Sequence, residues 1–220
     1  PYKKIYFNHS TGKAEKCTFC YPRIEVGIPT VCSETCVGRL RYIGLMLYDA
    51  DAVLEAASAK DSKHLYEAQL GVFLDPFDPE IAAEAERQGI PADWIEAARR
   101  SPVRKLIMDY RVALPLHPEY RTLPMVWYIP PLSPITSAAN AGQIGVNGQI
   151  PDVNQLRIPV RYLANLLTAG DTVPVVRALE RMLAMRAHNR SKYVDGVNNQ
   201  AVLDQVGLTQ HMVDDMYQVM

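Results

Sequence analysis

The chain has 220 residues, of which 48% are hydrophobic and 21% charged, as in many globular domains. Its formal net charge of −1 provides no basic surplus of the kind that indicates nucleic-acid binding. Prolines interrupt the longest apolar stretch, around 123–132, and a transmembrane helix needs roughly 20 apolar residues. We therefore expect no direct membrane span, and any membrane association would depend on a partner.

The first 48 residues predict a strand, a turn, a cysteine-rich loop and a second strand. The strand covers residues 3–8, and the composition of 9–13 indicates a turn. The loop occupies 17–36 and contains every cysteine of the chain. A partial apolar alternation predicts the second strand over 39–47.

From Tyr48 onward the sequence becomes mainly helical. Capping residues and apolar spacing predict helices over 49–58, 62–70, 78–88, 91–99, 102–110, 160–167, 172–186, 199–205 and 209–216. Residues 115–134 are rich in proline, which predicts an extended, irregular segment with at most an edge strand. Residues 137–157 are polar and glycine-rich, as in a loop. The predicted fold class is α+β, with a small module at 1–48 and a mainly helical domain at 49–220.

The cysteines carry the strongest chemical signal. Their spacing is Cys17-x2-Cys20-x11-Cys32-x3-Cys36, and such grouping in a larger chain indicates a metal or redox site rather than dispersed disulfides. A C-x3-C step is where ferredoxin chains pass from one cluster to the next, which favours iron–sulfur clusters. A structural zinc site is the alternative, although zinc favours two C-x2-C pairs. A thioredoxin-like motif would need a βαβ pattern, which is not seen.

Basic and aromatic residues surround these cysteines. Cations stabilise an anionic cluster and raise its reduction potential, and those that flank the cysteines are Lys16, Arg23, Arg39 and Arg41. Any single one of them could equally be an ordinary solvated charge. Phe19, Tyr21 and Ile24 could exclude water from a cluster or serve as plain core.

Longer stretches resemble a known family. Lys3–Asn8, Glu15–Glu25 and Pro29–Arg39 are similar to the four-cluster ferredoxin subunit of the molybdenum oxidoreductases. Ala113–Ile135 and Tyr162–Thr172 resemble, more specifically, the C-terminal extension of the respiratory nitrate reductase β subunit. The resemblance covers essentially the whole chain.

The resemblance implies a set of cluster ligands. Cys17, Cys20 and Cys32 match three ligands of one [4Fe-4S] cluster, and Cys36 matches a ligand of the neighbouring [4Fe-4S] cluster. Pro1 matches the proline that follows a ligand of a third cluster, so we expect the remaining ligands to lie upstream in a longer protein. The family's [3Fe-4S] cluster would have no ligand in this chain.

The resemblance also implies a function and partners. We expect an electron-transfer subunit, without catalytic residues of its own, that relays electrons between a membrane haem b subunit and a molybdopterin catalytic subunit in anaerobic nitrate respiration. The expected location is peripheral, at the cytoplasmic face of the membrane. A β subunit of a related nitrite-, chlorate- or dimethyl-sulfide-type oxidoreductase and a zinc-stabilised interaction module are the alternatives.

Other residues have simpler interpretations. His117 lacks companions for a metal site and is expected to form hydrogen bonds within the proline-rich segment. Trp127 and Tyr128 could anchor an interface but fit core packing, as does the stripe of Leu179, Met182 and Met185. Asp49 and Asp51 are expected to stabilise a helix start.

Overall fold

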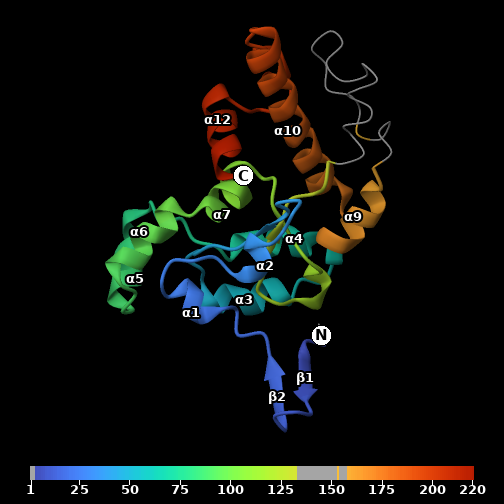
Figure 1. Cartoon of the computed structure of the whole chain (residues 1–220). Helices are drawn as coiled ribbons and strands as arrows, with labels where there is room; N and C mark the ends of the chain where they lie inside the picture. The colour runs from blue at the N-terminus through green and yellow to red at the C-terminus, as the bar shows by residue number, and fades with distance from the viewer. Residues whose placement is uncertain (1–2, 133–152, 154–157) are drawn as a thin grey trace.

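The structure, a computed structural model, describes residues 3–132, 153 and 158–220. A β-hairpin extends from a body of helices, and the cysteine-rich loop lies between the hairpin and that body (Figure 1). The predicted loop over 137–157 therefore falls largely outside the described residues; within it, Val153 is described and is buried. Within the described ranges, no helix combines the length and apolarity that a membrane span requires.

The hairpin pairs β1 (Ile5–Asn8) with β2 (Lys13–Lys16) in antiparallel register. The first strand was predicted, but the second was missed because three of its four residues are charged and show no apolar alternation. The turn closes with a hydrogen bond from the Gly12 amide to the Asn8 carbonyl at 2.9 Å, and Gly12 adopts a positive φ of 68° that suits glycine.

The cysteine-rich loop contains two one-turn helices, α1 (Tyr21–Ile24) and α2 (Val31–Glu34), which the sequence reading did not predict. In the described segment from residue 3 to residue 46, Thr30 alone is buried. This module therefore has no apolar core of its own in the part that the structure describes, and local hydrogen bonds define its shape.

A three-stranded sheet joins this module to the helical body. Its order is β3 (Arg41–Tyr42), β5 (Trp127–Tyr128) and β4 (Leu114–Pro115), all antiparallel. The proline-rich segment thus supplies the central strand, which corrects the prediction of at most an edge strand. The physical reason is that β5 itself contains no proline, whereas Pro115 lies on an edge strand, where a missing N–H is tolerated. The predicted strand over 39–47 is too long, since β3 has two residues.

The rest of the described chain is mainly helical, with connecting loops. The α-helices are α3 (Ala50–Ala57), α4 (Leu65–Gly71), α5 (Pro79–Arg87), α6 (Ala92–Arg100), α7 (Pro102–Arg104), α9 (Val160–Leu167), α10 (Thr172–Arg190), α11 (Gln200–Asp204) and α12 (Gln210–Val219). Short 3₁₀ turns occupy η1 (Ser62–His64) and η3 (Pro118–Tyr120), and π-helical turns occupy η2 (Lys105–Asp109) and η6 (Ser191–Asp195). The predicted helix over 102–110 is therefore split into α7 and η2, and the one over 172–186 extends to Arg190.

Side-chain caps explain several helix starts. Asp49 accepts hydrogen bonds from the amides of Asp51 and Ala52, which confirms its predicted role at the start of α3. Asp78, Asp171 and Thr209 cap α5, α10 and α12 in the same way.

The main core lies between α4, the three-stranded sheet and the C-terminal helices. Trp127 is 2% exposed and meets the Phe73 ring edge-to-face, with 5.6 Å between the ring centroids, so the prediction of core packing is confirmed for Trp127. Leu179, Met182 and Met185 are buried on α10, as predicted. A smaller cluster packs α5 against α6 through Leu47, Ala82, Ala85, Ile95 and Ala98.

Candidate functional site

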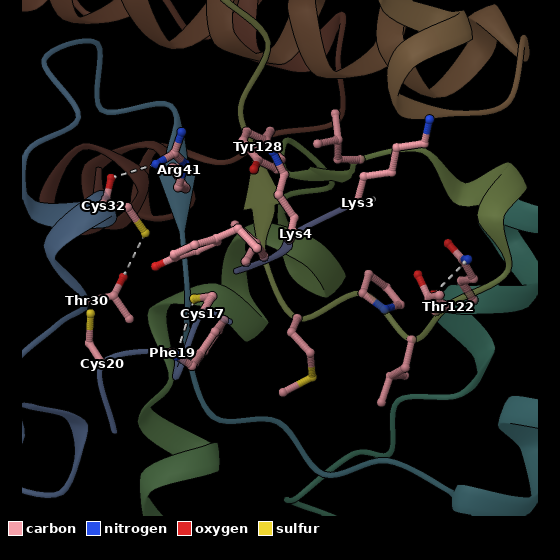
Figure 2. Close-up of a pocket in the computed structure, with 17 residues that line it drawn as sticks. Lys3, Lys4, Cys17, Phe19, Cys20, Thr30, Cys32, Arg41, Thr122 and Tyr128 are labelled. Carbon is pink, nitrogen blue, oxygen red and sulfur yellow. Dashed lines mark hydrogen bonds between the residues drawn. The ribbon is translucent and has the colours of Figure 1, made fainter. Parts of the chain in front are cut away.

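Cys17, Cys20 and Cys32 line one cavity of about 760 Å³. Figure 2 shows these three thiols at one end of the cavity, beside Thr30 and Arg41. Cys36 is not among the residues that line it and follows α2 at the approach to β3. All four cysteines are free thiols, so none is used in a disulfide. The fold therefore groups three of the sequence-predicted ligands and sets the fourth apart.

Local backbone geometry presents the first two thiols. Phe19 and Cys20 adopt left-handed conformations, with φ of 59° and 51°, immediately before α1 begins at Tyr21. Such conformations are uncommon outside glycine and carry an energetic cost. This tight turn brings the Phe19 amide to 3.3 Å from Cys17 Sγ, where it donates a hydrogen bond to the sulfur.

Two further sulfurs have polar partners. The Thr30 hydroxyl lies 3.4 Å from Cys32 Sγ, and the Leu40 amide donates to Cys36 Sγ at 3.4 Å. The Thr30 hydroxyl lowers the pKa of the Cys32 thiol, burial partly offsets this effect, and the Arg41 guanidinium lowers the pKa further. The Leu40 amide lowers the pKa of Cys36, again with a smaller contribution from Arg41. These groups favour the thiolate, which is the form that binds metals.

The opposite wall of the cavity comes from the proline-rich segment. The residues from that segment that line it are Leu116, Thr122, Leu123, Pro124, Met125 and Val126, whereas Tyr128 of the same segment lies beside Arg41 near the thiols (Figure 2). Sequence reasoning did not assign these residues to the site. The available signal was their mixed proline and apolar composition, which indicates a fixed, extended segment but does not show what it faces.

Gln69 holds this wall in place. It lies on α4, is 5% exposed, and donates through Nε2 to the carbonyls of Thr122 at 3.3 Å and Pro118 at 3.4 Å. His117 directly precedes Pro118 in the chain, bonds to Glu119 through Nδ1 at 2.7 Å and stacks on Tyr120. The prediction that His117 forms hydrogen bonds within this segment is therefore confirmed.

The residue set fits an iron–sulfur group. Three free thiols share one cavity, N–H and O–H groups point to the sulfurs, and an apolar wall lies across from them. Hydrogen bonds to sulfur and a hydrophobic surround are the features that tune such clusters. In the parts of the chain that the structure describes, no three His, Cys, Asp or Glu side chains are close enough to form a single-ion site.

Comparisons with known proteins agree with this chemistry. Residues 1–46 match a family model described as a 4Fe-4S dicluster domain, and residues 132–210 match one described as the respiratory nitrate reductase beta C-terminal region. The respiratory nitrate reductase 1 beta chain of Escherichia coli (strain K12) is 64% identical over 217 residues, which is 99% of this chain and 42% of that protein. The chain belongs to the respiratory nitrate reductase β family.

More distant relatives outline the breadth of the family. The nitrate reductase beta chain of Bacillus subtilis (strain 168) is 55% identical over the whole of this chain and 46% of its own length. The dimethylsulfide dehydrogenase subunit beta of Rhodovulum sulfidophilum is 36% identical over 87% of this chain and 39% of its own length. The chain thus spans less than half the length of these curated relatives.

Proposed function

We propose that this chain is part of an electron-transfer subunit that relays electrons through iron–sulfur clusters in nitrate respiration. The observation that carries the proposal is the cavity in which Cys17, Cys20 and Cys32 meet, in a chain that is 64% identical to a respiratory nitrate reductase beta chain. A [4Fe-4S] cluster, when bound, supplies a centre that accepts and returns one electron. The chain itself carries out no bond chemistry.

The protein's residues have separable roles in this proposal. Cys17, Cys20 and Cys32 hold one [4Fe-4S] cluster, and Cys36 contributes to the neighbouring one, with the other ligands supplied by the parent protein. The hydrogen bonds to the Cys32 and Cys36 sulfurs stabilise the thiolates. The wall from 116 to 126 places mainly apolar side chains across the cavity from the first cluster. Residues 1–48 form part of a ferredoxin-like module and 49–220 the helical domain that supports it.

The proposed partners are a molybdopterin catalytic subunit and a membrane haem b subunit, which holds the complex at the cytoplasmic face of the membrane. The names of the relatives, beta chain and subunit beta, support membership of a multi-subunit complex. The higher identity to nitrate reductase chains than to a chlorate reductase subunit at 31% favours nitrate over chlorate as the terminal acceptor.

Metal analysis of the full-length complex tests the cluster assignment. Purified without oxygen, the wild type should contain iron and sulfide in near-equal amounts. Cys32→Ser should remove the EPR signal of one cluster, and Cys36→Ser that of a different one. The matched control is Val37→Ala, at a fully exposed position between these ligands and β3, which should keep both signals. Zinc without iron would overturn the proposal in favour of the zinc-stabilised module.

Reoxidation tests the substrate. Clusters reduced in the intact complex should be reoxidised rapidly by nitrate and more slowly by chlorate or dimethyl sulfoxide. Faster reoxidation by one of the other acceptors would assign the chain to the corresponding relative.

A further inference from the structure

One of the four cations that flank the cysteines is placed differently from the others. Lys16 and Arg39 are exposed. Arg23 donates through Nε to the Pro29 carbonyl at 2.9 Å and pairs with the Glu34 carboxylate, which neutralises its charge. Arg41 is half-buried and is the one of these four that lines the cavity of the three thiols.

Arg41 is held on two sides. It lies on β3 directly opposite Tyr128 of β5, and its guanidinium carbon is 5.8 Å from the centroid of the Tyr128 ring. Its Nη1 donates to the Cys32 carbonyl at 3.0 Å, so the guanidinium is oriented alongside the Cys32 ligand (Figure 2). A planar guanidinium fixed by both a hydrogen bond and an aromatic face has little freedom to turn away.

A second nitrogen of this side chain, Nε, lacks a partner among the described residues. Among the described residues, the Arg41 Nε–H is buried and has no acceptor. A buried charged donor without an acceptor is costly, and such groups in folded proteins usually meet a ligand, an ion or water. A cluster bound by Cys32 would supply such an acceptor, because its sulfurs carry negative charge.

We propose that Arg41 donates its Nε–H to the sulfur shell of the cluster held by Cys32 and thereby sets that cluster's reduction potential. The inference rests on the proposed function and deepens it, since it names the residue that biases the relay. A reduced cluster carries one more negative charge than an oxidised one. A fixed cation and hydrogen bond therefore stabilise the reduced form and raise the potential.

The position of Arg41 also links two clusters. Its guanidinium donates to the Cys32 carbonyl, and the residue directly before it, Leu40, donates its amide to Cys36 Sγ at 3.4 Å, so Arg41 lies next to both cysteines. The two thiols are ligands of neighbouring clusters in the proposed function. Loss of Arg41 should therefore lower both potentials, and more so at the Cys32 cluster, where the hydrogen bond is lost together with the charge.

Redox titration of the full complex, followed by EPR, tests this role. In Arg41→Gln, the ratio of reduced to oxidised Cys32 cluster at a fixed potential should fall about tenfold, which corresponds to about 59 mV for a one-electron couple. Arg41→Lys keeps the charge without the Nε donor and should give an intermediate fall. The matched control is Arg23→Gln, which removes a neutralised arginine of the same module and should change the ratio less than twofold. Equal ratios in wild type and Arg41→Gln, with clusters assembled, would overturn the proposal.

A measurement on the wild type covers the case in which Arg41→Gln fails to assemble its cluster. Pulsed EPR of complex labelled with ¹⁵N in the arginine guanidinium should show a weakly coupled ¹⁵N nucleus at the reduced Cys32 cluster, retained in Arg23→Gln. Lack of this coupling in the wild type would refute the hydrogen bond. Lack of any iron–sulfur signal in the wild type would instead remove the proposed function, and this inference with it.

Discussion

Gly44 shows how tightly single residues fix the cysteine module on the helical body. It follows β3, and a Cβ built on it would lie 2.7 Å from Val103 Cγ2 and 2.8 Å from Ser101 Oγ. Both neighbours are buried at the start of α7. Gly44 therefore permits an approach between the two segments that any side chain would prevent.

We predict that Gly44→Ala lowers the free energy of unfolding by about 1–3 kcal/mol, because the added methyl group forces the segments apart. Gly71→Ala is the matched control. Gly71 ends α4, and a Cβ there would meet nothing within 4 Å, so alanine should raise stability by up to about 1 kcal/mol. Urea denaturation of both variants measures the difference. Equal stability of the two variants would show that the segment after β3 does not pack on the start of α7 as described.

At the level of residues, the sequence was sufficient to identify the candidate ligands but not the side chains that surround them. Cysteine spacing is local and was visible directly. The different surroundings of Arg23 and Arg41 could not be predicted from the sequence. Arg23 pairs with Glu34, whereas Arg41 lies against the ring of Tyr128, which is far along the chain. Side chains that act on a site from a distant segment leave no local pattern.

Among the elements, α10 depends on a single capping side chain at its start. The carboxylate of Asp171 accepts a hydrogen bond from the Val173 amide at 3.0 Å, and the helix then continues for 19 residues. We predict that Asp171→Ala destabilises the protein by about 1 kcal/mol, because an amide of the first turn loses its acceptor. Asp171→Asn retains a side-chain oxygen and should lose much less. Thermal and urea unfolding, followed by circular dichroism at 222 nm, compares the two, and equal losses would contradict the capping role.

Elements with local sequence signals were predicted well, whereas elements that depend on distant residues were not. Helices with an acidic or threonine cap and an apolar stripe, such as α3, α5 and α12, were predicted to within a few residues because both signals are local. The π-helical turn η2 was not, because Tyr110 closes a hydrogen bond to the Lys105 carbonyl at 2.8 Å while both side chains reach Asp215. The central position of β5 likewise depends on strands at 41 and 114.

Across the whole molecule, Asp215 connects the last helix to the middle of the chain. Lys105 Nζ donates to Asp215 Oδ2 at 2.9 Å, and the Tyr110 hydroxyl also donates to this carboxylate. Burial raises the pKa of Asp215, but the combined effect of Tyr110 and Lys105 outweighs it and holds the pKa below the ordinary value. The contact therefore depends on a charged Asp215.

The sign of the pH dependence follows from this lowered pKa. A carboxyl group with a lower pKa in the folded than in the unfolded state stabilises the fold above the unfolded value of about 3.9, and this stabilisation is lost as the pH falls through the folded value. We predict that Asp215→Asn lowers stability at pH 7 by about 1–3 kcal/mol and weakens its dependence on pH below about 4. Urea titrations from pH 2 to 7 measure both effects.

A double-mutant cycle provides the control. If the pair acts as described, Lys105→Met should cost clearly less in the Asp215→Asn background than in the wild type. Additive losses would show that Lys105 and Asp215 do not act together.

The fold class as a whole, α+β with a small cysteine module beside a helical domain, was predictable because it follows from the change in composition near Tyr48.

The pairing of β3 with β5 has a consequence for biogenesis. Ribosomes make the cysteine loop before Trp127 and Tyr128, and chains generally fold from the N-terminus as they emerge. Until β5 has been synthesised, β3 has no partner strand in the sheet, and the proline-rich wall cannot yet lie across the cavity from Cys17, Cys20 and Cys32. The cysteine loop is therefore complete before the segment that fixes its position on the helical body has been made.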